Sequence, residues 1–126
     1  MNALNLSLLF SLFLSAGALA DSLTGPQKNA VRSAKQYLSF QSFSREGLIR
    51  QLSSDAGDGY ELADATVAVD SLNIDYNNQA VKSANQYLQL QGFSCDGLIQ
   101  QLSSSAGDSY TISQATFGAQ QTDACK

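Results

Sequence analysis

The chain contains nearly the same sequence twice. Residues 29–72 and 79–122 align without a gap, and about half of the aligned positions are identical. The longest shared phrase, FS-x-x-GLI-x-QLSS, begins at Phe43 in the first copy and at Phe93 in the second. A repeat of this length is one supersecondary unit, and neighbouring units share buried surface. Positions that both copies keep therefore indicate structure, whereas positions that differ are free or specialised.

The first twenty residues are of a different kind. An apolar run over 5–14 is followed by the small-x-small sequence Ala18-Leu19-Ala20, which predicts a secretory signal cleaved after Ala20. No Lys or Arg precedes the apolar run, so a membrane anchor is the competing interpretation, although the segment is at the short limit for a span. We therefore expect an extracytoplasmic protein, periplasmic or secreted, that touches a membrane only if the signal stays uncleaved.

The rest of the sequence divides into a lead-in at 21–28, a first repeat at 29–74 and a second repeat at 75–126. Units of about fifty residues bury little surface alone, so we expect the two repeats to pack together around one core. The chain has 7 Lys and Arg against 11 Asp and Glu, a net charge of −4, and no basic stripe. Because phosphate binding needs clustered Lys and Arg, the composition argues against a nucleic-acid partner.

Each repeat contains three helical patterns. The first helix is expected to follow Thr24 or Gly25 as its cap in repeat 1, and Asp75 in repeat 2. The apolar residues of both helices recur with the period of one helix face. They are Ala30, Ala34, Tyr37 and Leu38 in repeat 1, and Ala80, Ala84, Tyr87 and Leu88 in repeat 2.

The second helix is expected to begin after Ser44 in repeat 1 and after Ser94 in repeat 2, because a serine hydroxyl can accept from an unpaired backbone N–H. Gly57 and its counterpart Gly107 are expected to end this helix. Both repeats also keep a glycine in its first turn (Gly47 in repeat 1), although glycine weakens a helix by about 1 kcal/mol. We expect close approach of another helix at that position.

The third helix is expected at 61–72 in repeat 1 and at 111–121 in repeat 2. Thr111 with Gln114 matches a capping box, whereas Glu61 is a poorer cap. The apolar face is weaker in repeat 2, where a glycine interrupts it, so we expect this helix to fray unless something ties it down. The predicted face in repeat 1 is Leu62, Ala65, Val69 and Leu72.

Cys95 and Cys125 are the only cysteines of a chain that carries an export signal, so we expect a disulfide between them. Fifty residues earlier, the equivalent positions are Arg45 and Asp75. We therefore predict that an ion pair between Arg45 and Asp75 takes the place in repeat 1 of the covalent link in repeat 2.

Several motif blocks recur in the same order in both repeats: A-x-x-x-A-x-x-YL, FS-x-x-GLI-x-QLSS, G-D-x-Y and a helix with an Ala-rich face. With the linking phrase NIDYN at 73–77, they resemble the host cell surface-exposed lipoprotein (Ltp) family of bacteria and their phages. The resemblance covers essentially the whole chain after the signal segment. It implies an all-α fold of two tandem three-helix, helix-turn-helix-like repeats packed together after an N-terminal signal segment.

Phage members of that family are associated with superinfection exclusion, in which a prophage protein stops an incoming phage from delivering DNA. The resemblance implies an exported protein-binding module that blocks this DNA entry by engaging a phage injection component or an envelope protein. The alternative is a periplasmic or secreted scaffold or adhesion module unrelated to phage. Family members usually begin with a lipoprotein signal whose cysteine is acylated, and no cysteine lies near Ala20. We therefore expect a free protein, or one retained by its uncleaved signal.

The residue types argue against an enzyme. The chain has no His, which removes the usual general base near neutral pH and the commonest metal ligand. No serine lies in a G-x-S-x-G setting, and the acidic turn at 55–61 does not have the spacing of a calcium loop. We expect Asp58 and Asp108 to bond turn amides. The sequence thus predicts no catalytic residue, no metal, no cofactor and no small-molecule substrate.

DNA reading by the start of the second helix is a rival interpretation, since Arg45 and Arg50 lie there. Repeat 2 has Cys95 and Gln100 at those positions, and the chain is acidic and carries an export signal, so we reject it. Partner contacts are instead expected at positions that the repeats do not share. The candidates are Asp55, Glu61, Asp64 and Asp70 on an acidic side of repeat 1, and Gln89, Gln91 and Gln100 on a polar side of repeat 2.

Overall fold

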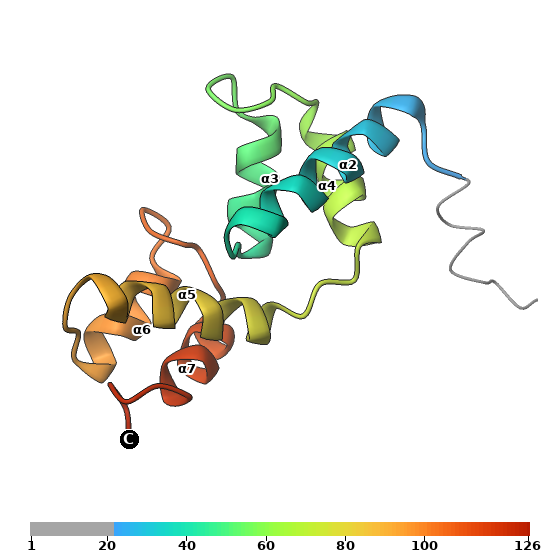
Figure 1. Ribbon diagram of the computed structural model, residues 1–126. Coiled ribbons are helices and arrows are strands. Elements are labelled where there is room, and N and C mark those ends of the chain that lie inside the picture. Colours follow the sequence, from blue (N-terminus) through green and yellow to red (C-terminus); the bar gives the residue numbers. More distant parts are fainter. Residues whose placement is uncertain (1–21) are drawn as a thin grey trace, which may run out of the picture.

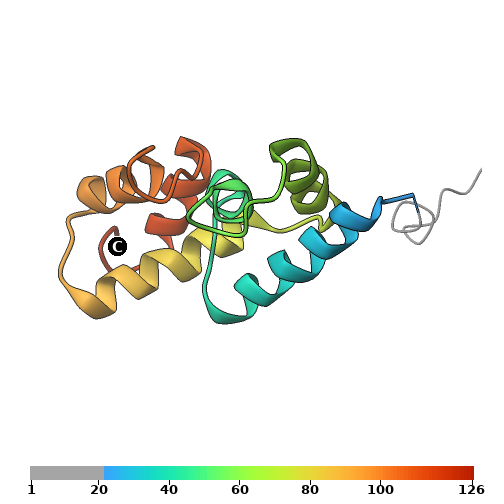
Figure 2. The ribbon, with the colours of Figure 1, turned by 90° about the horizontal axis from the view of Figure 1, so that it is seen from above.

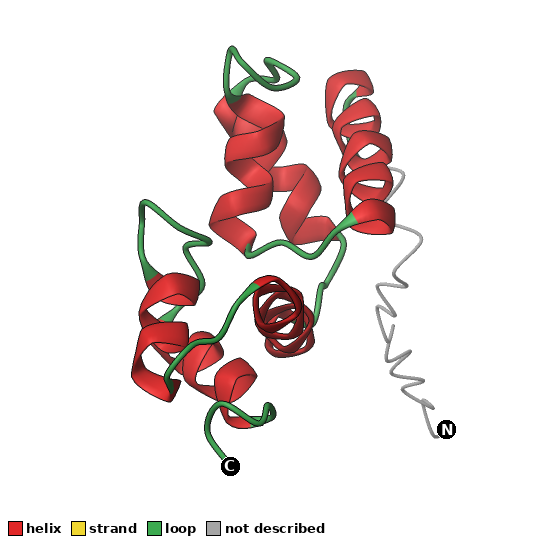
Figure 3. Ribbon diagram, turned by 60° about the vertical axis from the view of Figure 1, so that its left-hand side comes forward, coloured by secondary structure: helices red, strands yellow, loops and turns green. Residues whose placement is uncertain are grey.

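The computed structural model describes residues 22–126, so the predicted signal segment lies outside the described residues. Every regular element in residues 22–126 is a helix (Figure 1 and Figure 3), which confirms the all-α prediction. Repeat 1 contains α2 (Gly25–Phe40), α3 (Arg45–Ser53) and α4 (Leu62–Ser71). Repeat 2 contains α5 (Tyr76–Leu90), α6 (Cys95–Ser103) and α7 (Ile112–Gln120).

The repeats form two lobes that lie side by side (Figure 2), and each lobe has its own core. In each lobe the first and second helices both pack against the third. Leu48 and Leu52 are fully buried in repeat 1, and Leu98 and Leu102 are fully buried in repeat 2. The expectation of one shared core is therefore wrong, because each pair of leucines is enclosed by the helices of its own repeat.

The linker between the lobes is anchored on repeat 1. Tyr76 is the first residue of α5, yet with Ile74 it packs against the core of repeat 1. The Tyr76 hydroxyl is buried and, within residues 22–126, has no hydrogen-bond partner. Burial raises the pKa of Tyr76 to about 12. Asn73, at φ 49°, turns the chain between α4 and α5.

The predicted caps of the first and second helices are present. Thr24 caps α2 in a capping box with Gln27, and the Asp75 carboxylate accepts from the backbone N–H of the third residue of α5. The hydroxyls of Ser44 and Ser94 accept from backbone N–H groups in the first turns of α3 and α6 at 2.9 and 3.0 Å. Each of these caps joins residues three positions apart, so the start of each helix can be predicted from the sequence pattern.

The third helices begin as predicted, but their buried faces differ from the predicted one. Thr111 and Gln114 form a capping box at α7, whereas Glu61 makes no side-chain cap bond at α4. Leu62 is 64% exposed, so its place on the predicted apolar face is wrong. The buried residues of α4 are Ala65, Ala68 and Val69.

Two predictions about glycines are wrong. α3 ends at Ser53, and Gly57 lies in the following turn, where an added Cβ would come 2.0 Å from the carbonyl oxygen of Gln51. Gly47 faces no other helix: an added Cβ there would meet the cap hydroxyl of Ser44 at 3.0 Å and the backbone carbonyl of Asp108, in a turn of repeat 2, at 3.5 Å. In repeat 2, Gly97 meets only groups of its own repeat, and Gly107 lies against the Gln101 carbonyl as Gly57 lies against that of Gln51.

The glycine that permits close helix approach is Gly118. It is buried on α7 against Ala80 of α5, and an added Cβ would come 2.7 Å from the Ala80 backbone. Gly118 interrupts the apolar pattern of α7 because only glycine lets α5 and α7 lie so close.

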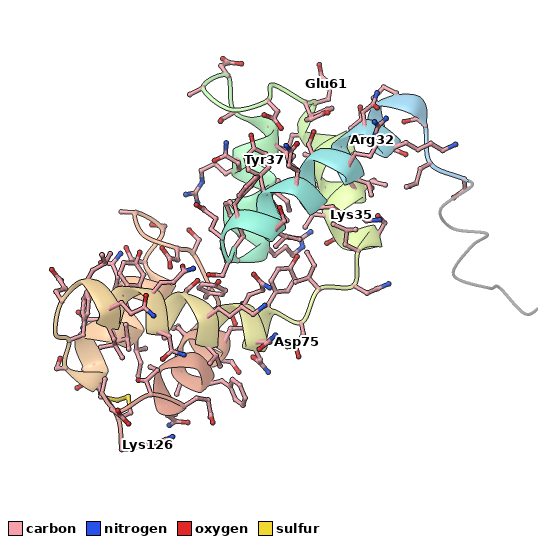
Figure 4. All side chains as sticks on the ribbon, viewed as in Figure 1. Arg32, Lys35, Tyr37, Glu61, Asp75 and Lys126 are labelled. Carbon is pink, nitrogen blue, oxygen red and sulfur yellow. A yellow bond between two sulfur atoms is a disulfide. The ribbon has the colours of Figure 1, made fainter. Side chains whose placement is uncertain are left out.

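The disulfide joins Cys95 at the start of α6 to Cys125 in the tail after α7, which confirms the predicted pairing. Figure 4 shows the sulfur–sulfur bond near Lys126. Thr122, between α7 and the disulfide, is only 3% exposed and donates from its hydroxyl to the Ala119 carbonyl at 2.7 Å. The end of the last helix is therefore tied to the rest of repeat 2.

The predicted ion pair between Arg45 and Asp75 is wrong. Arg45 binds Asp70 with two parallel bonds, from Nε to Oδ1 at 2.7 Å and from Nη2 to Oδ2 at 2.9 Å, and also pairs with Glu46 at 2.9 Å. The bond from Arg45 holds the pKa of Asp70 below its usual value. Asp75 instead lies at the start of α5 (Figure 4) and caps that helix. Repeat 1 thus links the start of its second helix to the last turn of its third helix, whereas repeat 2 links the equivalent start to the tail after its third helix.

Candidate functional site

The two lobes meet through a polar contact surface, here called the joint. Its first part places the segment before α3 against α5. The Ser42 and Ser83 hydroxyl oxygens lie 2.8 Å apart, and Ser42 Oγ also lies 3.2 Å from Gln86 Oε1, which can accept from it. The backbone N–H of Phe43 donates to Gln79 Oε1 at 3.0 Å.

The second part of the joint places α3 against the turn before α7. The Ser44 hydroxyl donates to the backbone carbonyl of Asp108, and Arg50 Nη2 donates to Ser109 Oγ at 2.9 Å. A hollow of about 350 Å³ lies along the joint, bounded among others by Ser42, Gly47 and Leu90. The joint therefore combines direct hydrogen bonds with an open groove.

A cluster of Tyr and Asp side chains supports this turn in both repeats. The Tyr37 hydroxyl donates to Asp58 at 2.7 Å, and the Tyr87 hydroxyl donates to Asp108 at 2.6 Å. The side chains of Asp58 and Asp108 thus accept from tyrosines, and the prediction that they bond turn amides is wrong. Burial raises the pKa of Asp108, while the bond from Tyr87 acts in the opposite direction. Because repeat 1 has the same cluster, it is a structural feature.

The joint changes the burial of residues that both repeats share. Ser44 is 2% exposed in the joint, whereas its counterpart Ser94 is exposed. Tyr110 is 3% exposed, and burial raises the pKa of its phenol, whereas its counterpart Tyr60 is only partly buried. The same chemical group therefore faces protein in one repeat and solvent in the other.

Several joint residues were not predicted as functional, although the repeat alignment carries a signal for them. Four polar contacts of the joint use a residue that the other repeat lacks. Gln79, Ser42, Arg50 and Ser109 correspond to Asn29, Gly92, Gln100 and Gly59. Ser109 even adopts φ 60°, a conformation that serine rarely takes, while making its joint contact. Some unshared positions thus serve the contact between repeats.

The four acidic candidates of repeat 1 do not behave alike. Asp64 accepts from Gln27 at 3.1 Å and Asp70 binds Arg45, so both already make contacts inside repeat 1. Asp55 and Glu61 are exposed, and Figure 4 shows Glu61 on the side of repeat 1 away from repeat 2. Asp55 and Glu61 are therefore better placed to meet a partner.

The glutamine candidates of repeat 2 are exposed but dispersed. Gln89 borders a hollow of about 480 Å³ beside Phe93, and Gln100 borders a separate hollow of about 320 Å³ beside Gly97. Gln91 ends α5, where its backbone N–H bonds to a carbonyl of that helix. The structure does not bring the three side chains to one surface.

Residues 22–126 contain no candidate metal cluster and no free cysteine. In this part of the chain no group of three or more carboxylate, cysteine or histidine side chains is placed to bind a metal ion, and both cysteines are in the disulfide. None of its helices has the length and apolar character that a membrane span requires. The arrangement offers polar grooves and exposed faces, which suit recognition.

A model of the family described as host cell surface-exposed lipoprotein matches residues 26–72 and residues 75–121, one match for each repeat. The chain belongs to the Ltp family. The family's description places its members at the host cell surface, and no enzyme family is indicated. None of the curated proteins compared with the sequence matches it.

Among solved structures, the chain is similar to Ltp, a superinfection exclusion protein from the Streptococcus thermophilus temperate phage TP-J34. The two are 33% identical with a TM-score of 0.71, and the similarity covers 80% of this chain and 99% of that one. The tandem architecture of this Ltp-family chain therefore extends over the whole of the phage protein's structure.

The joint can be tested with matched serines. We expect Ser44→Ala to destabilise the protein by about 1–3 kcal/mol, because it removes a helix cap and a hydrogen bond across the joint. Ser94→Ala removes the same cap without a joint contact and should cost about 0.5–2 kcal/mol. Urea unfolding of both variants measures the difference. Equal losses would show that the Ser44 bond to repeat 2 contributes nothing.

Proposed function

We propose that this Ltp-family protein acts outside the cytoplasm, where it binds another protein and thereby blocks DNA entry by a superinfecting phage. The observation that carries the proposal is the match to the phage superinfection exclusion protein over 99% of that structure, at 33% identity. The partner on this view is a component of the phage injection apparatus or an envelope protein that the phage uses.

The described surface supports binding over catalysis. The polar groove along the joint and the exposed carboxylates of Asp55 and Glu61 offer hydrogen-bonding and charged groups at the surface. Recognition of a protein needs complementary groups of this kind and no reaction centre.

The test is to express the full chain in a phage-sensitive host and to challenge it with a phage panel. Phage adsorption should stay unchanged, while the amount of phage DNA inside the cells, measured by quantitative PCR, should fall for at least one phage. A chain without residues 1–20 is the control and should give no protection, since it would remain in the cytosol. Unchanged DNA entry across the panel would contradict the proposal and favour a scaffold or adhesion role.

A further inference from the structure

Repeat 1 carries a second copy of the α5 surface that binds segment 41–44 in the joint. The positions on α5 that bind the segment 41–44 have counterparts on α2, and with Arg32 and Tyr60 these counterparts line an open hollow of about 450 Å³. We call this surface the outer face. It consists of Asn29, Arg32, Ser33, Gln36 and Tyr60. Figure 4 shows Arg32 on the side of repeat 1 away from repeat 2.

The outer face has the same Ser–Tyr contact as the α5 side of the joint, but no segment from residues 22–126 covers it. Ser33 Oγ lies 3.0 Å from the Tyr60 hydroxyl, as Ser83 Oγ lies 2.7 Å from the Tyr110 hydroxyl. In the joint, the segment before α3 covers this pair and leaves Ser83 4% exposed. On the outer face Ser33 and Tyr60 are only partly buried.

A second copy of this chain is a poor occupant of the outer face. The segment that would enter is 91–94, which has Gly92 where the joint uses the Ser42 hydroxyl. Asn29 is shorter than the glutamine that binds a backbone N–H in the joint. Gln100 and Gly59 stand where the joint has Arg50 and Ser109, which hydrogen-bond to each other. At these positions the chain therefore lacks four side chains that make polar contacts in the joint.

The charge of the outer face favours an acidic segment. Of the five residues that make up the outer face, Arg32 is the charged one, and it is exposed. Helix starts commonly carry a carboxylate in the first turn, as α3 and α6 do with Glu46 and Asp96. A helix start of this kind would complement Arg32.

We propose that the outer face is a docking surface for a different protein, which inserts an extended segment leading into a helix. That segment presents a free backbone N–H to Asn29, a hydroxyl or amide side chain to Ser33 and Gln36, and a carboxylate to Arg32. The contacts to Asn29, Ser33 and Gln36 follow the geometry of the joint, with the partner in the place of segment 41–44, whereas the contact to Arg32 has no counterpart there. The inference rests on the proposed function for the view that the partner is a protein.

The first experiment needs no phage. The substitutions Asn29→Gln, Gly59→Ser, Gly92→Ser and Gln100→Arg restore the joint contacts at both free ends. Because a head-to-tail contact between identical chains does not close, this variant should form oligomers that grow with concentration in sedimentation velocity. The control carries only Asn29→Gln and Gly59→Ser, and should stay monomeric like the unmodified chain. A four-substitution variant that folds but stays monomeric would show that the outer face does not receive such a segment.

The second experiment uses the superinfecting phage as the probe. Arg32→Glu should raise phage DNA entry about tenfold above that of the unmodified chain, because it reverses the charge that faces the partner. Lys82→Glu is the matched control, since it makes the same charge change at the equivalent exposed position of repeat 2, and should leave protection unchanged. Circular dichroism and thermal unfolding verify that both variants fold.

The outcomes separate this inference from the proposed function. If the unmodified chain gives no protection, the proposed function fails, and the sedimentation experiment still tests the outer face. If the unmodified chain protects and Arg32→Glu protects equally, the docking surface is wrong while the proposed function stands. If the unmodified chain forms oligomers that Arg32→Glu abolishes, the occupant is a second copy, and the proposal of a different protein is overturned.

Discussion

Replacing Cys95 and Cys125 by serine is expected to lower the free energy of unfolding of repeat 2 by about 3–4 kcal/mol. The disulfide spans 30 residues that include α6 and α7, and the chain-entropy model gives this magnitude for a loop of that size. The effect is large for a lobe of about fifty residues, whose stability is only a few kcal/mol. The bond also ties down the tail after α7, which would otherwise be free to fray.

The two separate cores decide how this loss is distributed. Each set of buried leucines belongs to one repeat, and the joint between them is polar. Native-state hydrogen exchange should therefore show reduced protection in α6 and α7, with α3 and α4 changed by about 1 kcal/mol or less. An equal fall in both repeats would contradict this prediction and show that the lobes unfold as one unit.

Leu52→Ala is expected to destabilise repeat 1 by about 2–5 kcal/mol. Leu52 is fully buried in the core of repeat 1, and truncation removes apolar contacts and leaves a cavity beside α4. Repeat 1 has no disulfide to limit its unfolded state, so we expect this lobe to unfold at markedly lower urea concentration. Urea unfolding followed by amide signals from each lobe measures the loss separately.

Leu102→Ala is the matched control because Leu102 is the equivalent buried residue of repeat 2. It should cause a loss of the same size, but in repeat 2, where the disulfide keeps the unfolded chain compact. If either substitution lowered the stability of the other lobe by as much as its own, the joint would couple the cores more strongly than its few hydrogen bonds indicate.

Much of the fold follows from the sequence because it depends on atoms close together along the chain. The caps at Thr24, Ser44 and Asp75 need only residues three positions on, and the helix faces need only the helical period. The pairing of Cys95 with Cys125 needed only that the chain has no other cysteine. The repeat itself indicated two similar units, since the same pattern of residues folds in the same way.

The tertiary structure alone decided which distant groups meet. Arg45 binds Asp70 and not Asp75, because the left-handed turn at Asn73 carries the chain away to start α5. The joint and the outer face likewise exist only because α5 and α2 present equivalent surfaces, of which one is covered by segment 41–44. Contacts of this kind depend on how whole helices are placed relative to one another. That placement is fixed by the burial of apolar side chains in the separate core of each lobe.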